Sequence, residues 1–445
     1  MMKQSSFKNQ GMRMLRPLVA LLLLLVLILA LAACSQKPAA TEAPAAEPTK
    51  AMEEEKSEQP KEEAKEEAPE QEITLAIEHF SIIKGTTWSG AHDRAGKRIA
   101  EKYPNVKYIY REEVGPDSTV PFAEELIAEG ANIVAGNAEF MGMPLKDIAD
   151  KYPDVTFASV IASDLTTKPN FVRYFPRQYQ ALYLEGLVAA ALTKTGNIGV
   201  VSAFPSVQVI RRQAGFTLGV LDGAKLLNKD VNIYVKYVGD WYKPDEESEI
   251  AKTLIDQYKV DVLTQQSDSG SPLDVATKAG IWYVGKDMDI VGFYGWSSTD
   301  TVAISFDTRW EVIYDAMVQA KMKGTEPETI MYPGMESTFT MADGTVEPTV
   351  DIMNDGKVGV DAISPKADVP QEIKDLVAQR REEMMKGEWD PFTAHAFISN
   401  GTGLDLEGNP VPEKGKEVKP AGEEPTVEWL LSQFNFDLEG VTILE

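Results

Sequence analysis

The sequence predicts an α/β protein of two lobes, each with a parallel sheet flanked by helices, and a ligand cleft between the lobes. From residue 73 onward, short apolar strands alternate with one-sided helices, and this alternation occurs in two series. An extended break near residues 170–176 separates the two series. Repeated strand–helix units imply parallel strands with helices on both faces of the sheet. In such open sheets, ligands bind at the carboxyl ends of the strands.

The first strand–helix unit organises the chain. Residues 73–77 are β-branched and aliphatic, which is typical of a buried strand. Thr86 or Thr87 is suited to cap the following helix, whose apolar residues recur every three or four positions: Trp88, Ala91, Ala95, Ile99 and Tyr103. Pro104 ends that helix. Trp88 therefore stands either at the lip of the cleft or in the core at a helix start.

The remaining elements of the two lobes continue the alternation of strands and helices. In the first series we expect strands at 106–110, 131–135 and 155–161 and helices at 120–129 and 143–152. In the second series we expect strands at 198–202, 231–238, 260–264 and 281–284 and helices at 178–192, 207–221, 246–258 and 274–280. A strand at 301–306 and a helix at 310–323 are expected to return to the first lobe.

These elements define the predicted domains. The first lobe comprises residues 73–174 and 297–330, and the second lobe comprises residues 175–296. Residues 331–445 are less regular and are expected to form a C-terminal extension packed on the lobes. Helices at 371–386 and 427–434 are predicted there, with turns and loops over 401–425.

The N-terminal residues predict export and anchoring. Residues 1–33 combine four basic residues, no acid and an apolar run from 18 to 33, as in a secretory signal. The run ends in Leu-Ala-Ala followed by Cys34, a sequence that resembles the lipobox of bacterial lipoproteins. That resemblance implies that Cys34 becomes a diacylated N-terminus held in the lipid bilayer, and two acyl chains suffice for stable anchoring. Beyond Cys34, residues 35–72 are polar and acidic and predict a disordered linker.

Composition excludes several classes of function. The 445 residues carry a formal net charge of −25, which disfavours nucleic acid as a partner because phosphates require basic residues. A single cysteine rules out an internal disulfide and any Cys-x-x-Cys metal or redox site, and three scattered histidines suggest no metal cluster. No cofactor and no catalytic residue is predicted, because a Gly-x-Ser-x-Gly motif and a P-loop are both missing.

The mature part of the chain resembles the basic membrane lipoprotein (Bmp) family, the substrate-binding proteins of bacterial ABC importers that are related to purine nucleoside receptors. The landmarks are the segments at 88–93, 152–157, 183–187, 198–201, 210–219, 265–268 and 387–393 in their order and spacing. The resemblance implies a type I periplasmic-binding fold and a lipid-anchored, extracytoplasmic receptor. Its partner would be an ABC permease in the membrane, and a monomer is expected.

In that family a purine base is clamped between aromatic rings, and polar groups hold its edge. The positions here that match as ligand-binding candidates are Trp88, His92, Phe140, Trp241, Gln266, Asp268, Asp287 and Trp296. A flat heteroaromatic ligand stacks well on such rings. The nucleoside receptors' Asp-x-Ser-Phe-Asn pattern is replaced here by residues 85–89, so a free base such as adenine is as plausible a ligand as a nucleoside.

Three alternatives stay open at the level of sequence. A receptor of the same fold for a sugar or another small metabolite would also use aromatic stacking. An enzyme would need acid–base residues, for which a pair such as Asp268 and Asp287 could serve, although no motif marks a reaction. A purely structural lipoprotein would not need a cleft.

Overall fold

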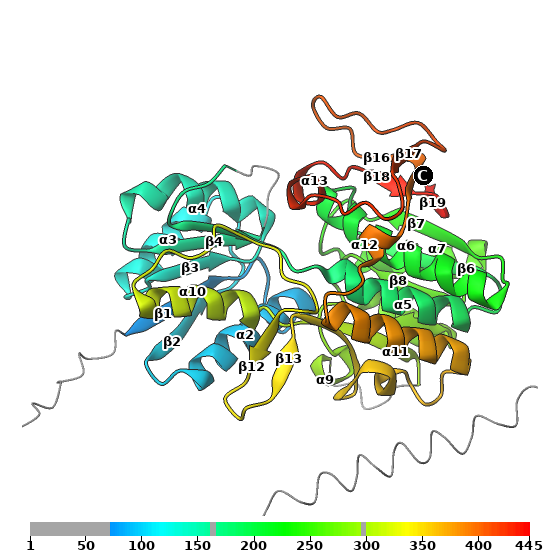
Figure 1. Cartoon of the computed structure of the whole chain (residues 1–445), viewed down its shortest axis with the longest axis horizontal. Coiled ribbons are helices and arrows are strands. Elements are labelled where there is room, and N and C mark those ends of the chain that lie inside the picture. The colour runs from blue at the N-terminus through cyan, green and yellow to red at the C-terminus, as the bar shows by residue number, and fades with distance from the viewer. Residues whose placement is uncertain (1–71, 161–165, 295–299) are drawn as a thin grey trace, which may run out of the picture. The chain divides into compact units, whose positions relative to one another are not determined.

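The computed structural model describes residues 72–160, 166–294 and 300–445. Two sheets form the centres of two lobes, and helices cover the faces of both sheets (Figure 1). The prediction of a two-lobed α/β fold with parallel sheets is confirmed. Within the described residues, no helix combines the length and the apolar character needed to cross a membrane.

The sheet of the first lobe is parallel throughout, with the strand order β11-β5-β4-β3-β1-β2. Its strands are β1 (Ile73–Glu78), β2 (Val106–Arg111), β3 (Ile133–Gly136), β4 (Thr156–Val160), β5 (Phe171–Tyr174) and β11 (Ile330–Met331). The main helices of this lobe are α2 (Thr87–Lys102), α3 (Thr119–Ala128), α4 (Gly142–Ile148) and α10 (Glu311–Lys323), with short turns η1 (Glu139–Met141) and η2 (Ala149–Lys151).

The sheet of the second lobe has the order β15-β14-β10-β9-β8-β6-β7-β19. Its strands are β6 (Asn197–Ser202), β7 (Asn232–Tyr237), β8 (Val262–Gln265), β9 (Trp282–Val284), β10 (Val302–Thr308), β14 (Val350–Asn354), β15 (Lys357–Val358) and β19 (Val441–Leu444). Strands β14 and β15 are antiparallel to their neighbours, and the other pairs are parallel. The helices are α5 (Gln178–Leu192), α6 (Val207–Leu227), α7 (Pro244–Tyr258), α8 (Ser271–Ala279), α9 (Ile290–Phe293) and α11 (Gln371–Met385).

The position of the strand predicted at residues 301–306 differs from the prediction. Strand β10 pairs with β9 and β14 in the second sheet, so the expectation that 301–306 returns to the first lobe is wrong. The whole strand is buried, and its apolar first half, residues 302–304, fits the interior of either sheet equally well. Helix α10, which follows it, does pack against α2 and β1 of the first lobe.

The C-terminal extension adds small elements to this framework. A hairpin of β12 (Thr338–Thr340) and β13 (Val346–Pro348) precedes β14, and a turn η3 (Gly359–Ala362) follows β15. Strands β16 (Phe397–Gly403), β17 (Glu417–Lys419) and β18 (Phe436–Leu438) form a third, three-stranded sheet, beside the short helices α12 (Pro391–Ala394) and α13 (Val427–Ser432). The last strand, β19, then joins the edge of the second sheet beside β7.

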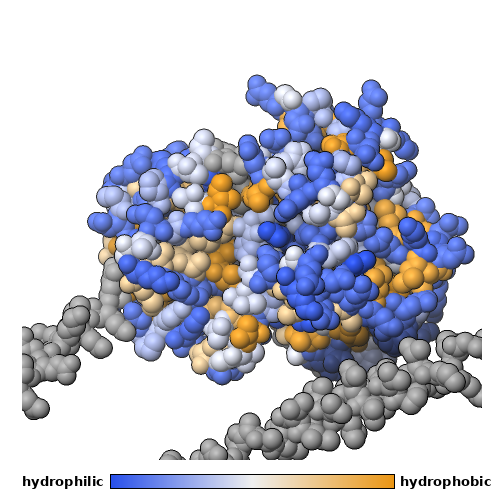
Figure 2. Space-filling model, in the orientation of Figure 1, coloured by the Kyte–Doolittle hydropathy of each residue, from blue (hydrophilic) through white to orange (hydrophobic). Residues whose placement is uncertain are grey.

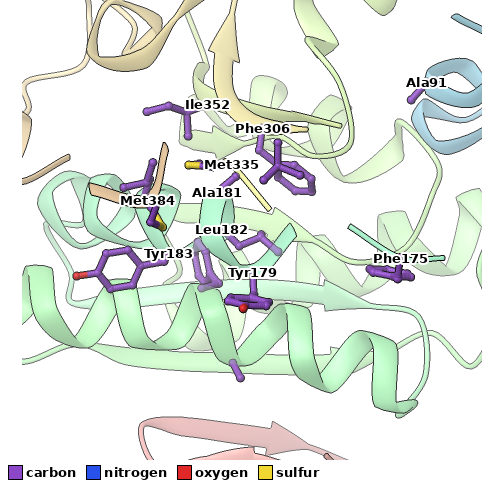
Figure 3. Packing of buried hydrophobic residues seen from close by; sticks show 14 of the residues in the cluster. Ala91, Phe175, Tyr179, Ala181, Leu182, Tyr183, Phe306, Met335, Ile352 and Met384 are labelled. Atoms are coloured by element: carbon purple, nitrogen blue, oxygen red, sulfur yellow. The ribbon is translucent and has the colours of Figure 1, made fainter. Parts of the chain in front are cut away.

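The core of the second lobe is centred on helix α5, in which every residue is buried. Figure 3 shows part of this core, where Leu182 and Tyr183 of α5 lie near side chains of β10, β14 and α11. Helix α6 approaches α5 so closely that a Cβ on Gly219 would lie 1.9 Å from the backbone oxygen of Tyr183. Glycine is therefore required at that crossing. Figure 2 shows apolar residues gathered where the two lobes meet on this face of the molecule.

Candidate functional site

A small cavity lies where the carboxyl ends of strands from both sheets meet. In the first lobe the lining comes from α2, η1, the end of β4 and the loops after β1 and β3, and in the second lobe from α6 and the loops after β7 and β8. The lining residues are Phe80, Trp88, Asn137, Ala138, Glu139, Val160, Gln208, Trp241 and Asp268. Its volume is about 30 Å³, which is room for a water molecule or two and too small for a purine. The lobes are therefore closed on one another in this structure.

Trp88 forms part of the first-lobe wall. Thr86 caps helix α2 by accepting a hydrogen bond from the backbone N–H of Ser89 at 3.1 Å, and this turn directs Trp88 inward. The indole Nε1 donates to the backbone oxygen of Asn137 at 2.7 Å, and the ring lies edge-on to Trp310 at 5.1 Å between centroids. Only 5% of Trp88 is exposed. Both interpretations of Trp88 from the sequence therefore describe it in part, because its ring is packed in the core and the residue also lines the cavity.

Asn137 fixes the geometry of this wall. Its side-chain oxygen accepts the backbone N–H of Phe80 at 2.9 Å, and its amide nitrogen donates to Nδ1 of His79 at 3.2 Å. Burial, with a smaller contribution from Lys97, lowers the pKa of His79 to about 3, so the imidazole is neutral and able to accept. The neighbouring Glu78 is fully buried, and neither of its carboxylate oxygens has a hydrogen-bond partner in the part of the chain that the structure describes. Burial raises the pKa of Glu78 to about 8.

Trp241 lies on the opposite wall, in the loop after β7. The residue is half-buried, and its ring stands edge-on to Phe204 at 4.9 Å between centroids. Its backbone oxygen accepts the N–H of Asp268 at 2.8 Å, so the loop after β7 and the loop after β8 form one surface. Trp241 has a single aromatic neighbour among the residues with described positions, so its ring is less constrained than that of Trp88, which contacts His92, Phe175 and Trp310.

Asp268 belongs to a buried chain of charges in the second lobe. The Lys286 ammonium pairs with Asp268 and also lies 2.7 Å from Oδ2 of Asp287, whose Oδ1 accepts from Arg212 at 2.8 Å. Burial raises the pKa of Asp268 to about 6, although Lys286 opposes this shift. Burial would also raise the pKa of Asp287, but Lys286 and Arg212 together hold it below its usual value. The backbone of Asp287 has φ 69°, a conformation that costs energy in a residue other than glycine.

Several predicted site residues lie away from the cavity lining. Phe140 is 37% exposed in η1, and its neighbours Ala138 and Glu139 face the cavity instead. His92 is fully buried behind Trp88, stacked on Trp310 at 4.0 Å with Nδ1 2.5 Å from the Tyr314 hydroxyl. Gln266 is buried, and its backbone N–H donates to the oxygen of Val201.

Asp287 and Trp296 are the two remaining predicted site residues. Asp287 does not line the cavity, but it contacts Lys286, which in turn holds the lining residue Asp268. Trp296 lies outside the described residues, as does Cys34.

Sequence reasoning missed four lining residues with polar or aromatic side chains, namely Phe80, Asn137, Glu139 and Gln208. Phe80 follows β1, and Asn137 and Glu139 follow β3, so the rule that ligands sit at strand carboxyl ends would have found them. Glu139 is largely buried, which raises its pKa. Gln208 stands in the first turn of α6 and has no comparable signal. Among the described residues, no cluster of histidine, cysteine and carboxylate side chains is placed to hold a metal ion.

Comparison with known proteins gives a family and a fold. The model of the Bmp family, described as ABC transporter substrate-binding protein PnrA-like, matches residues 74–346. A purine-binding protein of Brucella abortus is 28% identical over 80% of this chain and 88% of its own length. A Haloferax volcanii protein named for glucose binding in an ABC transporter is 28% identical over 73% of this chain and 75% of its own.

Two solved structures share the fold at lower identity. A solute-binding protein of an ABC transporter from Conexibacter woesei superposes with a TM-score of 0.53 at 20% identity, covering 72% of this chain and 98% of that one. A transcriptional activator of the comK gene from Bacillus halodurans gives a TM-score of 0.54 at 21% identity over 72% of this chain and 99% of that one. The fold therefore serves more than one function.

Proposed function

Because the chain belongs to the Bmp family of ABC transporter substrate-binding proteins, we propose that it is the extracytoplasmic receptor that delivers a purine nucleobase or nucleoside to a membrane permease. The family binds solutes for transport and is not enzymatic. The purine, the permease and the lipid anchor at Cys34 belong to the proposal.

The observation that carries the purine proposal is the meeting of two tryptophans from opposite lobes at one cavity. Trp88 comes from the first strand–helix unit and Trp241 from the loop after β7, and both line the same space. Two indoles on facing walls suit a flat heteroaromatic ring, because each face of the ring gains a stacking partner. The purine-binding relative of Brucella abortus supports the same ligand class.

The polar lining suits the edge of such a ring. Glu139 and Asn137 approach from the first lobe, and Gln208 and Asp268 approach from the second. Carboxylates and amides in a site shielded from water discriminate strongly between ring edges, since an unmatched polar group would remain buried without a partner. Asp268 is held by Lys286, so the lysine fixes the carboxylate that the ligand would meet.

Binding requires the lobes to separate first, because the closed cavity holds about 30 Å³. The ring of Trp241 is packed more loosely than the ring of Trp88, so we expect the Trp241 ring to move as the ligand enters. Contacts from both lobes exist together only in the closed arrangement, and a ligand that makes them biases the population towards closure.

A sugar is the second candidate ligand. Carbohydrate rings also stack on tryptophan, and the lining offers carboxylates and amides for hydroxyl groups. The Haloferax volcanii relative named for glucose binding is as similar as the purine-binding one.

The test is to identify the ligand directly. Protein purified without the signal segment would be denatured and its released small molecules identified by mass spectrometry. Calorimetric titration with adenine, adenosine, guanosine, ribose and D-glucose would follow on refolded protein. We expect a purine to be recovered and to bind saturably. Saturable binding of glucose or ribose alone would overturn the purine proposal in favour of the sugar.

A further inference from the structure

Helix α2 carries two stripes of residues that face different parts of the molecule. The stripe that the sequence reveals is Trp88, Ala91, Ala95 and Ile99, which is buried in the core of the first lobe. A second stripe, displaced by one position, consists of Thr87, Gly90, Arg94 and Arg98. Residues three and four apart lie on one side of a helix, so this second stripe also forms a continuous face.

The second stripe contacts residues outside the first-lobe sheet at every position. The Thr87 hydroxyl lies 3.5 Å from Oδ2 of Asp287. Arg94 pairs with Asp307 at 2.8 Å and donates to the backbone oxygen of Thr308 at the end of β10. Further along the helix, Arg98 pairs with Glu311 at 3.0 Å.

Gly90 occupies the tightest point of this stripe. A Cβ atom built on Gly90 would lie 2.4 Å from Cε2 and 2.9 Å from Cζ of Phe293, well inside van der Waals contact. Phe293 ends α9, which follows β9 of the second sheet, and α9 contacts α2 (Figure 1). The ring of one lobe is therefore seated directly on the backbone of the other.

The backbone of Gly90 does not itself require glycine. Gly90 lies inside α2 with a right-handed conformation, where glycine is less favourable than alanine by about 1 kcal/mol. In a helix interior with ordinary dihedral angles, the missing side chain matters for close approach. The approaching group is the Phe293 ring, because it supplies all three of the nearest atoms.

We propose that Gly90 sets how closely the two lobes can approach, and that a side chain at this position must displace the half-buried Phe293 ring before the lobes can close fully. This inference rests on the proposed receptor function. Position 90 lies half a turn from Trp88 in α2, so a wedge there also holds the Trp88 wall away from the Trp241 wall. A ligand clamped between these walls then loses contacts with one of them.

The test compares Gly90→Ala with a matched glycine in the same helix. A Cβ on Gly96 would lie 2.4 Å from Cε2 of Tyr108, which is an equal clash but with a residue of the first lobe itself. Gly96→Ala therefore strains one lobe without separating the two. The double variant Gly90→Ala with Phe293→Ala removes the ring that the new methyl group would strike.

Calorimetric titration with adenine and adenosine, and small-angle scattering with and without the ligand, supply the readouts. We expect Gly90→Ala to weaken purine binding at least tenfold and to make the protein less compact than the wild type both without and with ligand. Addition of Phe293→Ala should recover most of the compaction and bring the affinity back towards that of Phe293→Ala alone. Gly96→Ala should lower the melting temperature while leaving the affinity within about threefold of the wild type.

The outcomes separate this inference from the proposed function. If the wild type binds a purine and Gly90→Ala binds it equally well with equal compaction, the inference is overturned. Equal losses of affinity in the Gly90 and Gly96 variants would also overturn it, since helix distortion would then explain both. If the wild type binds no purine, the proposed function fails. The ligand-free scattering then decides the inference, because a wedge must expand a protein that is closed without ligand, and identical profiles would refute it.

Discussion

Replacing Trp241 by alanine tests the proposed clamp most cleanly. The residue is half-buried in a loop with one aromatic neighbour, so its removal should cost less than about 2 kcal/mol of folding stability. If the indole stacks on a base, its loss should weaken binding by about 1 to 3 kcal/mol, the range found for base–aromatic stacking. At 1.4 kcal/mol per decade, this corresponds to a loss of affinity of about fivefold to more than a hundredfold.

Calorimetric titration with adenine and adenosine measures this loss, and a melting curve on the same sample reports folding. Trp241→Phe should keep most of the affinity because a ring face remains. Tyr242→Ala is the matched control, since Tyr242 is the next residue, is 39% exposed and does not line the cavity. A Trp241→Ala variant with wild-type affinity and wild-type melting temperature would remove Trp241 from the site, and the stacking argument would fail with it.

Three further predictions follow from the same structure. Trp88→Ala should lower the free energy of unfolding by about 3 to 5 kcal/mol, measured in urea, because its ring is packed against other aromatic rings; an unchanged midpoint would contradict that packing. Folded protein holds the Glu78 proton up to about pH 8 and unfolded protein only to about pH 4.5, so stability should fall across that window by up to about 1.4 kcal/mol per pH unit. Glu78→Gln should flatten this slope in urea titrations at pH 5 and pH 8, and a slope as steep as the wild type's would exclude Glu78 as its cause. Cys34→Ser should release the protein from the membrane fraction without changing ligand affinity, whereas full membrane retention would argue against acylation of Cys34.

The regular elements of both lobes could be predicted because their residues are locally consistent. Helix α5 begins and ends where the sequence predicts, since apolar residues predominate from Gln178 to Leu192. Helix α6 extends to Leu227, six residues beyond the predicted end, and stops where Asn228 adopts a left-handed conformation. The predicted end is too early because Asp222 and Gly223 interrupt the apolar pattern, although Ala224 is buried and Leu227 packs against the core.

Pairing between distant strands could not be predicted. Strand β19 is four residues long and follows loops, so nothing local assigns it to the edge beside β7. The same limit explains β10, whose partners β9 and β14 come from different parts of the chain. Local patterns specify the type of an element, whereas its neighbours depend on the packing of the whole lobe.

The candidate site was predicted in part for a similar reason. Trp88, Trp241 and Asp268 are candidates that follow from the resemblance to the family, and all three line the cavity. His92 lies one turn beyond Trp88, and the sequence cannot show that Trp310 and Tyr314 cover it from a helix more than two hundred residues away. The proposed role of Gly90 could likewise not be predicted from the sequence, because it depends on the Phe293 ring from the other lobe.

The position of β19 has a consequence for how the protein reaches its folded state. The first sheet is complete once the chain has been made as far as Met331, but the second sheet gains its outer strand only from residues 441–444. Until these residues emerge, β7 presents an open edge with unpaired backbone groups, which is prone to pairing with another chain. The second sheet therefore lacks its last strand until the end of the chain is made, and its completion requires a contact that spans more than two hundred residues between β7 and β19. A chain that is cut short would show this exposed edge, and aggregation of chains ending before residue 441 would begin there.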